Sequence, residues 1–201
     1  MAGWRRLRGA FLPKQIAVRL KLPFLGEISG TWEPGLAERD AAWELYIELI
    51  TRVSVVDLGP DEGLVREALS SLYTLFGTTR DILRRHGPVV APRSRQHDVT
   101  FGHVAIGVLN GALRPLLTKW HPALQAWEAR REPDVDPFAH ERAWERFDQL
   151  HADLATTRRT LAELAAVLAD VAGAAYLLPD VPLLKQPGEN SGGGGVAAGT
   201  T

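Results

Sequence analysis

The chain contains no cysteine. This absence excludes disulfide bonds, a thiolate nucleophile and a metal site built on thiolates. Long apolar runs are missing as well: the most apolar helical stretch, residues 161–178, contains Glu163 and Asp170, which makes it a poor membrane span. No apolar segment of signal-peptide length follows the charged start at residues 4–8. We therefore expect a cytoplasmic protein.

Neither sign of charge is in excess. The chain carries 23 basic and 24 acidic residues, and this balance argues against nucleic acid as a partner. The basic residues that precede the first acidic residue, Glu27, are Arg5, Arg6, Arg8, Lys14, Arg19 and Lys21. We expect this basic N-terminal arm to be an ordinary solvated segment. The alternative is contact with phosphate or with an anionic membrane surface.

A β-hairpin is predicted within the arm, which we place at residues 1–34. Apolar residues at Ile16, Val18, Leu20 and Leu22 alternate with alanine, arginine and lysine, as in a half-buried strand. Residues 27–32 form a second β-leaning stretch that can pair back. Because one hairpin is only marginally stable alone, we expect it to lie on helices.

Two amphipathic helices are predicted to follow the hairpin. The first begins at Pro34, and its apolar residues are Trp43, Tyr46, Ile47, Ile50 and Val53. The second spans residues 61–86 and ends at Gly87–Pro88. Its apolar face comprises Val65, Ala68, Leu69, Leu72, Leu75, Phe76, Ile82 and Leu83.

A third helix begins near Asp98 or Thr100, either of which is a good N-cap. Pro115 should kink or divide this helix, because proline removes a helical hydrogen bond. A further break is expected at His121–Pro122.

The fourth predicted helix has the strongest periodicity in the chain. Asp136 followed by Pro137 is a helix start signal. The apolar residues then follow a heptad pattern, with its seam at Phe147, Leu150, Leu154, Thr157, Leu161, Leu164, Leu168 and Val171. A single helix of this extent would be about 55 Å long at about 1.5 Å per residue.

Four amphipathic helices with short connections predict a mainly all-α fold, an antiparallel four-helix bundle with a long C-terminal helix. The bundle is expected at residues 35–176, and residues 177–201, rich in proline and glycine, are expected to be a disordered tail. Because the first helix is shorter than the fourth, one end of the fourth helix could protrude and bind a partner. The alternative is that its heptad seam packs entirely inside the bundle.

The sequence offers no recognisable catalytic or metal-binding motif. A di-metal site in a helical bundle needs two Glu-x-x-His motifs, and the nearest match is a single Asp148-x-x-His151. Neither a nucleophile elbow nor a phosphate-binding loop is present. We therefore assign no catalytic residue, metal or cofactor, and the question of an enzyme stays open.

One face of the third helix is a candidate ligand-binding site. His103, Gly107, Asn110 and Arg114 are spaced by four, three and four residues and therefore share a face. Because Gly107 and Gly111 have no side chains, a ligand can approach the backbone there. Arg114 would bind an anion that Asn110 orients, and Arg80 of the second helix could reach the same pocket. The alternative is structural, with the glycines admitting a neighbouring helix and the polar residues completing hydrogen bonds.

The segment at residues 108–122 resembles a motif of uncharacterised bacterial helical proteins, which reads Leu-Asn-x-x-Leu-Arg-Pro-x-Leu-x-x-Trp-His-Pro. Residues 72–80 look like the preceding helix of that group. The resemblance covers residues 35–130, and the element from Trp120 to Pro122 is its most specific part. No activity is assigned to the group. Some of its members lie near bacterial defence genes, which implies an accessory role.

We expect a helical module that binds another protein or self-associates through the seam of the fourth helix. The candidate partner-binding residues are Trp120, His121, Leu154, Leu161 and Leu168. The alternative function is a regulator that binds a small molecule or nucleotide through the polar face of the third helix.

Overall fold

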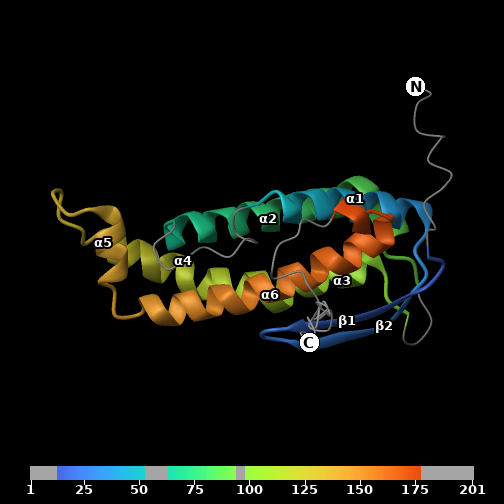
Figure 1. Ribbon diagram of the computed structural model, residues 1–201, viewed down its shortest axis with the longest axis horizontal. Helices are drawn as coiled ribbons and strands as arrows, with labels where there is room; N and C mark the ends of the chain where they lie inside the picture. Colours follow the sequence, from blue (N-terminus) through green and yellow to red (C-terminus); the bar gives the residue numbers. More distant parts are fainter. Residues whose placement is uncertain (1–12, 53–62, 94–97, 178–201) are drawn as a thin grey trace, which may run out of the picture.

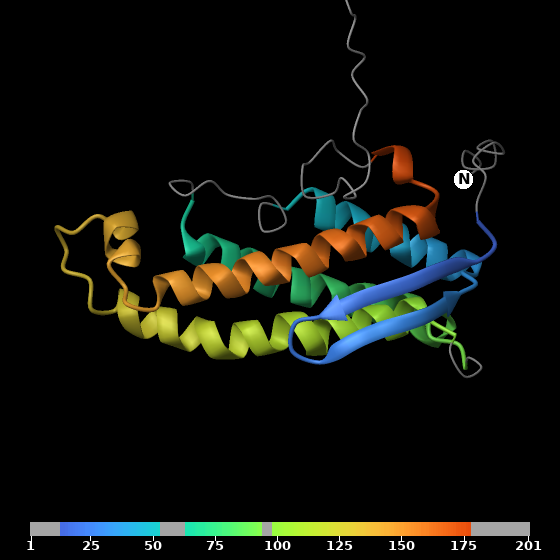
Figure 2. The ribbon, with the colours of Figure 1, turned by 60° about the horizontal axis from the view of Figure 1, so that its bottom comes forward.

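The computed structural model describes residues 13–52, 63–93 and 98–177. The fold is mainly helical, with one two-stranded antiparallel sheet (Figure 1). The long helices run along the longest axis of the molecule, and Figure 2 shows the hairpin lying along one side of them. A mainly helical fold with an N-terminal hairpin is therefore confirmed. Residues 1–12 of the basic arm and residues 178–201 of the expected tail lie outside the described residues.

The hairpin consists of β1 (Ile16–Leu22) and β2 (Gly26–Trp32), paired antiparallel with Ile16 opposite Trp32. The predicted alternating residues of β1 are all buried. β1 packs against α6 (Phe147–Ala172), where the Thr160 hydroxyl donates to the Lys21 carbonyl at 3.2 Å. The hairpin therefore rests on the helices, as predicted.

The remaining elements complete the helical part of the molecule. They are α1 (Leu36–Ile50), α2 (Val65–His86), the short 3-10 helix η2 (Gly87–Val90), α3 (Phe101–Val108), the π-helical turn η3 (Leu109–Leu113), α4 (Arg114–Glu128), α5 (Pro137–Arg142) and, after α6, the 3-10 turn η4 (Ala175–Leu177). α1 packs against α6 and α2, and α2 packs against α4. The expected four-helix bundle is not confirmed: a π-helical turn changes the third predicted helix, and the fourth is divided into α5 and α6.

The predicted apolar face of α2 is buried or half-buried against the core. α1 differs from the prediction by about one position: its buried apolar residues are Ala41, Ala42, Leu45, Tyr46 and Leu49, whereas Trp43 is 37% exposed. The two alanines allow α1 to lie close to its neighbours. Val53 and residues 61–62, which the sequence assigned to these two helices, lie outside the described residues.

The third predicted helix is continuous from α3 into α4, but its hydrogen-bond pattern changes before Pro115 in the π-helical turn η3. Proline has no N–H, so the carbonyl of Gly111, four residues earlier, lacks its helical donor. The backbone N–H of Phe24 in the hairpin turn donates to this carbonyl at 3.1 Å. The carbonyl left free by Pro115 is therefore one of the points at which the hairpin is attached to the helix.

Two predicted boundaries are wrong. The break expected at His121–Pro122 does not occur, and α4 continues through Pro122. Because Pro122 has no N–H, the Thr118 carbonyl loses its helical donor. Thr118 is exposed, so water can take the place of that donor. The single long fourth helix is also wrong, because α5 ends at Arg142 and α6 begins at Phe147. The 26 residues of α6 extend about 39 Å, shorter than the expected 55 Å.

The heptad seam of α6 lies inside the fold. Apart from the half-buried Phe147, all its residues are buried: Leu150, Leu154, Thr157, Leu161, Leu164, Leu168 and Val171. α6 packs against α1, α2, α4 and β1. Of the two alternatives for the seam, the structure therefore has packing inside the helical core.

Candidate functional site

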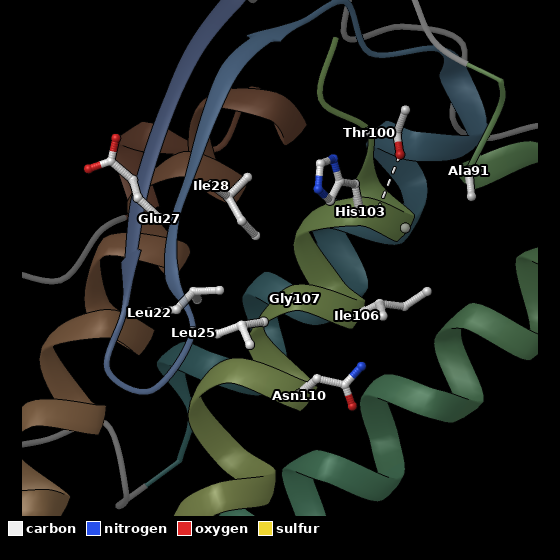
Figure 3. A pocket seen from close by; sticks show the side chains of 11 residues that line it. Leu22, Leu25, Glu27, Ile28, Ala91, Thr100, His103, Ile106, Gly107 and Asn110 are labelled. Carbon is white, nitrogen blue, oxygen red and sulfur yellow. Dashed lines mark hydrogen bonds between the residues drawn. The ribbon is translucent and has the colours of Figure 1, made fainter. Parts of the chain in front are cut away.

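A cleft of about 630 Å³ lies between β2 and α3. The residues that line it include Leu22, Leu25, Ile28, His103, Ile106 and Asn110. Figure 3 shows the three hairpin side chains directed toward α3, and His103, Ile106 and Asn110 projecting from successive turns of the helical segment. Apolar surface is accessible here, because Leu25 is 64% and Ile106 is 49% exposed. We call this feature the β2–α3 cleft.

Two glycines on the predicted ligand face allow the hairpin to approach the helix. A Cβ on Gly107 would lie 2.4 Å from Ile28 Cδ1, and a Cβ on Gly111 would lie 2.8 Å from Leu22 Cδ1. The glycines therefore admit a strand and its turn, where the structural alternative expected a neighbouring helix. Of the residues in these contacts, Leu22, Ile28 and Gly107 line the cleft.

The buried carboxylate of Glu38 joins the elements that form the cleft. It accepts hydrogen bonds from Trp32 Nε1 at 3.0 Å, from the Phe101 N–H at 3.0 Å and from the Gly35 N–H at 2.9 Å. These donors lie at the end of β2, at the start of α3 and at the start of α1. Glu38 therefore sets the spacing between β2 and α3. In the sequence, the only signal of Glu38 is an acidic residue in a first helical turn, which does not reveal its contacts with β2 and α3.

The structure brings together two of the four predicted ligand-binding residues. His103 and Asn110 line the β2–α3 cleft, and the α3 N-terminus there is capped by the Thr100 hydroxyl, which accepts from the His103 N–H at 3.2 Å. Arg114 is exposed outside the lining, with its guanidinium 5.8 Å from the centre of the Phe76 ring. Arg80 is exposed on α2 and also lies outside the lining. The predicted anion-binding arginines therefore do not face this cleft.

Four of the five predicted partner-binding residues lie in the core. Trp120, Leu154, Leu161 and Leu168 are at most 1% exposed, so a partner cannot reach them in the folded protein. The Trp120 indole donates to Asp153 Oδ2 at 2.8 Å, which links α4 to α6. The apolar pattern of a heptad seam is the same for an internal and an external contact, so the sequence alone does not distinguish the two.

His121, the fifth predicted partner-binding residue, belongs to a polar cluster that the sequence did not reveal. Its Nδ1 lies 3.3 Å from Arg66 Nη1, and Arg66 makes two hydrogen bonds to the Glu128 carboxylate at 2.7 and 2.5 Å. Burial and the nearby guanidinium lower the pKa of His121. The ring also meets the edge of Tyr73 at a centroid distance of 5.7 Å.

Glu141 completes this cluster from α5. It is 3% exposed, and its oxygens accept from the N–H groups of Val65 at 2.9 Å and Arg66 at 3.1 Å. The carboxylate thus caps the N-terminus of α2, where negative charge is favourable. Burial nevertheless raises the pKa of Glu141. No sequence signal marks this contact, because 75 positions separate Glu141 from Arg66.

The side chains around the β2–α3 cleft are suited to binding. They offer apolar surface, an imidazole and a carboxamide, and the Glu27 carboxylate is already held by Arg19 Nε at 3.1 Å.

Within the described residues, no group of three or more histidine or acidic side chains is placed to hold a metal ion. No helix in the described ranges is long and apolar enough to cross a membrane.

Comparisons with known proteins give no family for the chain. No protein-family model, curated protein or solved structure matches it.

Proposed function

We propose that the protein is a non-catalytic protein–protein interaction module, an adaptor or assembly component, and that its docking surface is the β2–α3 cleft. The observation that carries this proposal is the exposed apolar surface around a well-defined hollow. Leu25 and Ile106 line the cleft, and Phe24, beside Leu25 in the hairpin turn, is 43% exposed. Exposed apolar patches with polar residues around them are typical of interaction sites.

The energetics favour a macromolecular partner. Complete burial of one leucine or isoleucine side chain contributes about 1.5–3 kcal/mol. Partial burial of Leu25, Ile106 and Phe24 together would therefore contribute a few kcal/mol. This is a substantial part of the binding free energy of a complex of moderate affinity. We propose that α1, α2, α4 and α6 act together as a bundle-like scaffold for the hairpin.

An accessory role in a bacterial defence system is the setting that the resemblance at residues 108–122 implies for such a module. Much of that segment is buried in the structure, including Leu113, Leu116 and Trp120. The resemblance therefore concerns the scaffold, and the partner has to be found by experiment.

The experiment is an affinity purification of the tagged protein from its source organism, with three baits compared quantitatively by mass spectrometry. The baits are the unaltered protein, Ile106→Glu and Leu36→Glu. Leu36 is the matched control, because it is 82% exposed and does not line the cleft. We expect one stoichiometric partner with the unaltered protein and with Leu36→Glu, and its loss with Ile106→Glu. Equal recovery on all three baits, or no partner on any, would contradict the proposal.

The second candidate function is a regulator that binds a small molecule or nucleotide in the same cleft. Its volume of about 630 Å³ lies in the range of ligand pockets, and His103 and Asn110 provide polar contacts. A thermal-shift screen tests this function. A ligand that raises the melting temperature of the unaltered protein but not of Asn110→Ala would favour it over protein binding.

A further inference from the structure

We propose that the protein has a second binding site, a pocket beside α5 that takes a small zwitterion of the amino-acid class. The pocket has a volume of about 290 Å³, and the residues that line it include Arg66, Glu128, Arg131, His140 and Glu141. We call it the α5 pocket. Figure 1 shows α5 at one end of the long helices, away from the hairpin. The site is therefore separate from the β2–α3 cleft, and the inference does not depend on the function proposed for that cleft.

The lining of the α5 pocket is held in place by contacts within the protein. The His140 ring stacks on the Trp127 indole at a centroid distance of 4.6 Å, and its Nε2 lies 3.0 Å from the Trp127 carbonyl oxygen. Because a carbonyl oxygen only accepts, Nε2 carries the hydrogen of this bond, and Nδ1 is the ring nitrogen to which a ligand can bond. Asp136 caps α5 by accepting from the Ala139 N–H at 2.9 Å. The pocket is thus formed before a ligand binds, which lowers the entropic cost of binding.

The buried end of the pocket carries an excess of negative charge. The Arg66 guanidinium pairs with one carboxylate, that of Glu128, through two N–H groups at 2.7 and 2.5 Å. The second carboxylate, Glu141, is 3% exposed and accepts from the backbone N–H groups of Val65 and Arg66. Backbone N–H groups supply partial charges, so they do not balance a whole negative charge. Within the described lining, two carboxylates therefore share one partly buried guanidinium.

The surroundings of this end do not remove the excess. Burial and the Arg66 guanidinium lower the pKa of the neighbouring His121, so its ring is largely neutral at about pH 7. Burial raises the pKa of Glu141, and the nearby Glu128 carboxylate acts in the same direction. Residues 53–62, which precede α2 in the chain, include acidic side chains but no lysine or arginine. The cationic group of a ligand would supply the missing charge.

The exposed end of the pocket carries a positive charge. Arg131 follows α4 and is exposed, and its Nη1 donates to the Val135 carbonyl at 2.5 Å. A guanidinium has five N–H groups, so this bond leaves others that can pair with a carboxylate. The α5 pocket thus has an anionic inner end and a cationic outer end.

The charges, the apolar wall and the volume together define the ligand. Leu64 and Pro137 supply apolar lining between the charged groups. A volume of about 290 Å³ lies at the lower end of the range of ligand pockets, about 300–1,000 Å³, so the ligand is smaller than a nucleotide. A free amino acid with an apolar side chain fits these conditions. Its ammonium group pairs with the two glutamates, its carboxylate pairs with Arg131, and its side chain packs on the apolar wall.

The first test measures the melting temperature of the full-length protein with each of the twenty common amino acids. We expect leucine to raise it in a concentration-dependent manner. Leucinamide keeps the ammonium group without the carboxylate, and isocaproate keeps the carboxylate without the ammonium group. Each should bind at least about tenfold more weakly than leucine in calorimetric titrations, because each loses one charge-assisted pair.

The second test locates the site with two pairs of variants. Arg131→Gln and Glu128→Gln should each weaken leucine binding at least about tenfold. The matched controls are Arg130→Gln and Glu132→Gln, because both residues are exposed close to Arg131 in the chain and neither is among the described lining residues. Both controls should bind leucine normally. Urea unfolding of all four variants establishes that each is folded.

The outcomes also separate this site from the β2–α3 cleft. Ile106→Glu should leave leucine binding unchanged, and loss of binding in that variant would place the ligand in the cleft and overturn the proposal. Binding of leucinamide or isocaproate as tightly as leucine would show that the ligand is not recognised as a zwitterion. No stabilisation by any of the twenty amino acids, or normal leucine binding by both Arg131→Gln and Glu128→Gln, would overturn the proposal and leave the interaction function untouched.

Discussion

At the scale of single residues, the glycines differ in what a side chain would meet. A Cβ on Gly111 would lie 2.9 Å from the Cβ of Leu25, which is fixed to the hairpin backbone. A Cβ on Gly77, in the middle of α2, would meet nothing within 4 Å. Gly111 is therefore required by packing, whereas Gly77 only lowers helix propensity.

We expect Gly111→Ala to lower the free energy of unfolding by about 1–3 kcal/mol, because the hairpin turn has to move away from η3. Gly77→Ala should raise it by about 0.5–1 kcal/mol. Urea unfolding followed by tryptophan fluorescence measures both variants. If both substitutions change stability in the same direction, the close contact between the hairpin and η3 is not as described.

His121 makes stability depend on pH. Burial and the Arg66 guanidinium lower its pKa from the ordinary 6.5. The unfolded chain therefore takes up a proton at higher pH than the folded protein. The contribution of the neutral imidazole is complete above the unfolded pKa and is lost as the pH falls through the folded pKa.

We expect His121→Gln to reduce the loss of stability between about pH 7 and about pH 5, measured as the slope of the free energy of unfolding against pH. A comparison near pH 8, where the histidine is neutral in both states, separates the packing effect of the substitution from titration. Identical slopes for the two proteins would show that His121 does not titrate differently in the folded state.

At the scale of elements, an aromatic cluster holds α5 against α4. The buried Trp144 lies between Trp120 and Trp127, with ring centroids 5.8 and 6.4 Å away. The Trp127 indole stacks on His140 at 4.6 Å and donates to the His140 carbonyl at 2.9 Å. Trp144 lies in the connection between α5 and α6, at the point where the predicted long helix is divided.

We expect Trp144→Ala to lower the free energy of unfolding by about 3–5 kcal/mol, because it leaves a large cavity between α4, α5 and α6. Trp43→Ala is the control, since Trp43 is 37% exposed on α1 and should cost much less. Thermal unfolding and near-ultraviolet circular dichroism report the two effects. Similar losses for both tryptophans would mean that α5 is not held by this cluster.

At the scale of the whole molecule, Glu38 connects segments that are far apart in the sequence. Its separation from Phe101 is 63 positions, and both groups are buried. The carboxylate satisfies three donors from the hairpin, the loop before α1 and the start of α3. Unpaired buried donors are costly, so this one residue stabilises the whole junction beside the cleft.

We expect Glu38→Ala to lower the free energy of unfolding by about 3–5 kcal/mol, because it leaves buried N–H groups without acceptors. Glu38→Gln keeps the shape and one acceptor oxygen, and should cost about 1–3 kcal/mol. Denaturant unfolding gives both values. If both variants are as stable as the unaltered protein, the junction does not depend on this carboxylate.

The sequence by itself determined the features that depend on near neighbours. The period-two pattern at Ile16–Leu22 specified a strand, and the heptad pattern specified the apolar side of α6. Asp136 was identified as a helix cap, and Thr100 was one of two candidates beside Asp98, because a cap bonds to backbone groups only three residues away. Pro115 was identified as an interruption because its missing N–H acts within one helical turn.

Only the tertiary structure decided which distant residues meet. It placed His103 and Asn110 beside the hairpin and left Arg80 and Arg114 outside the cleft. It also buried the seam that the sequence equally allowed as an interface, and brought Glu141 to the start of α2. The physical reason is that an apolar or polar pattern sets which side of an element is favourable, whereas the packing of the whole core selects the partner that this side contacts.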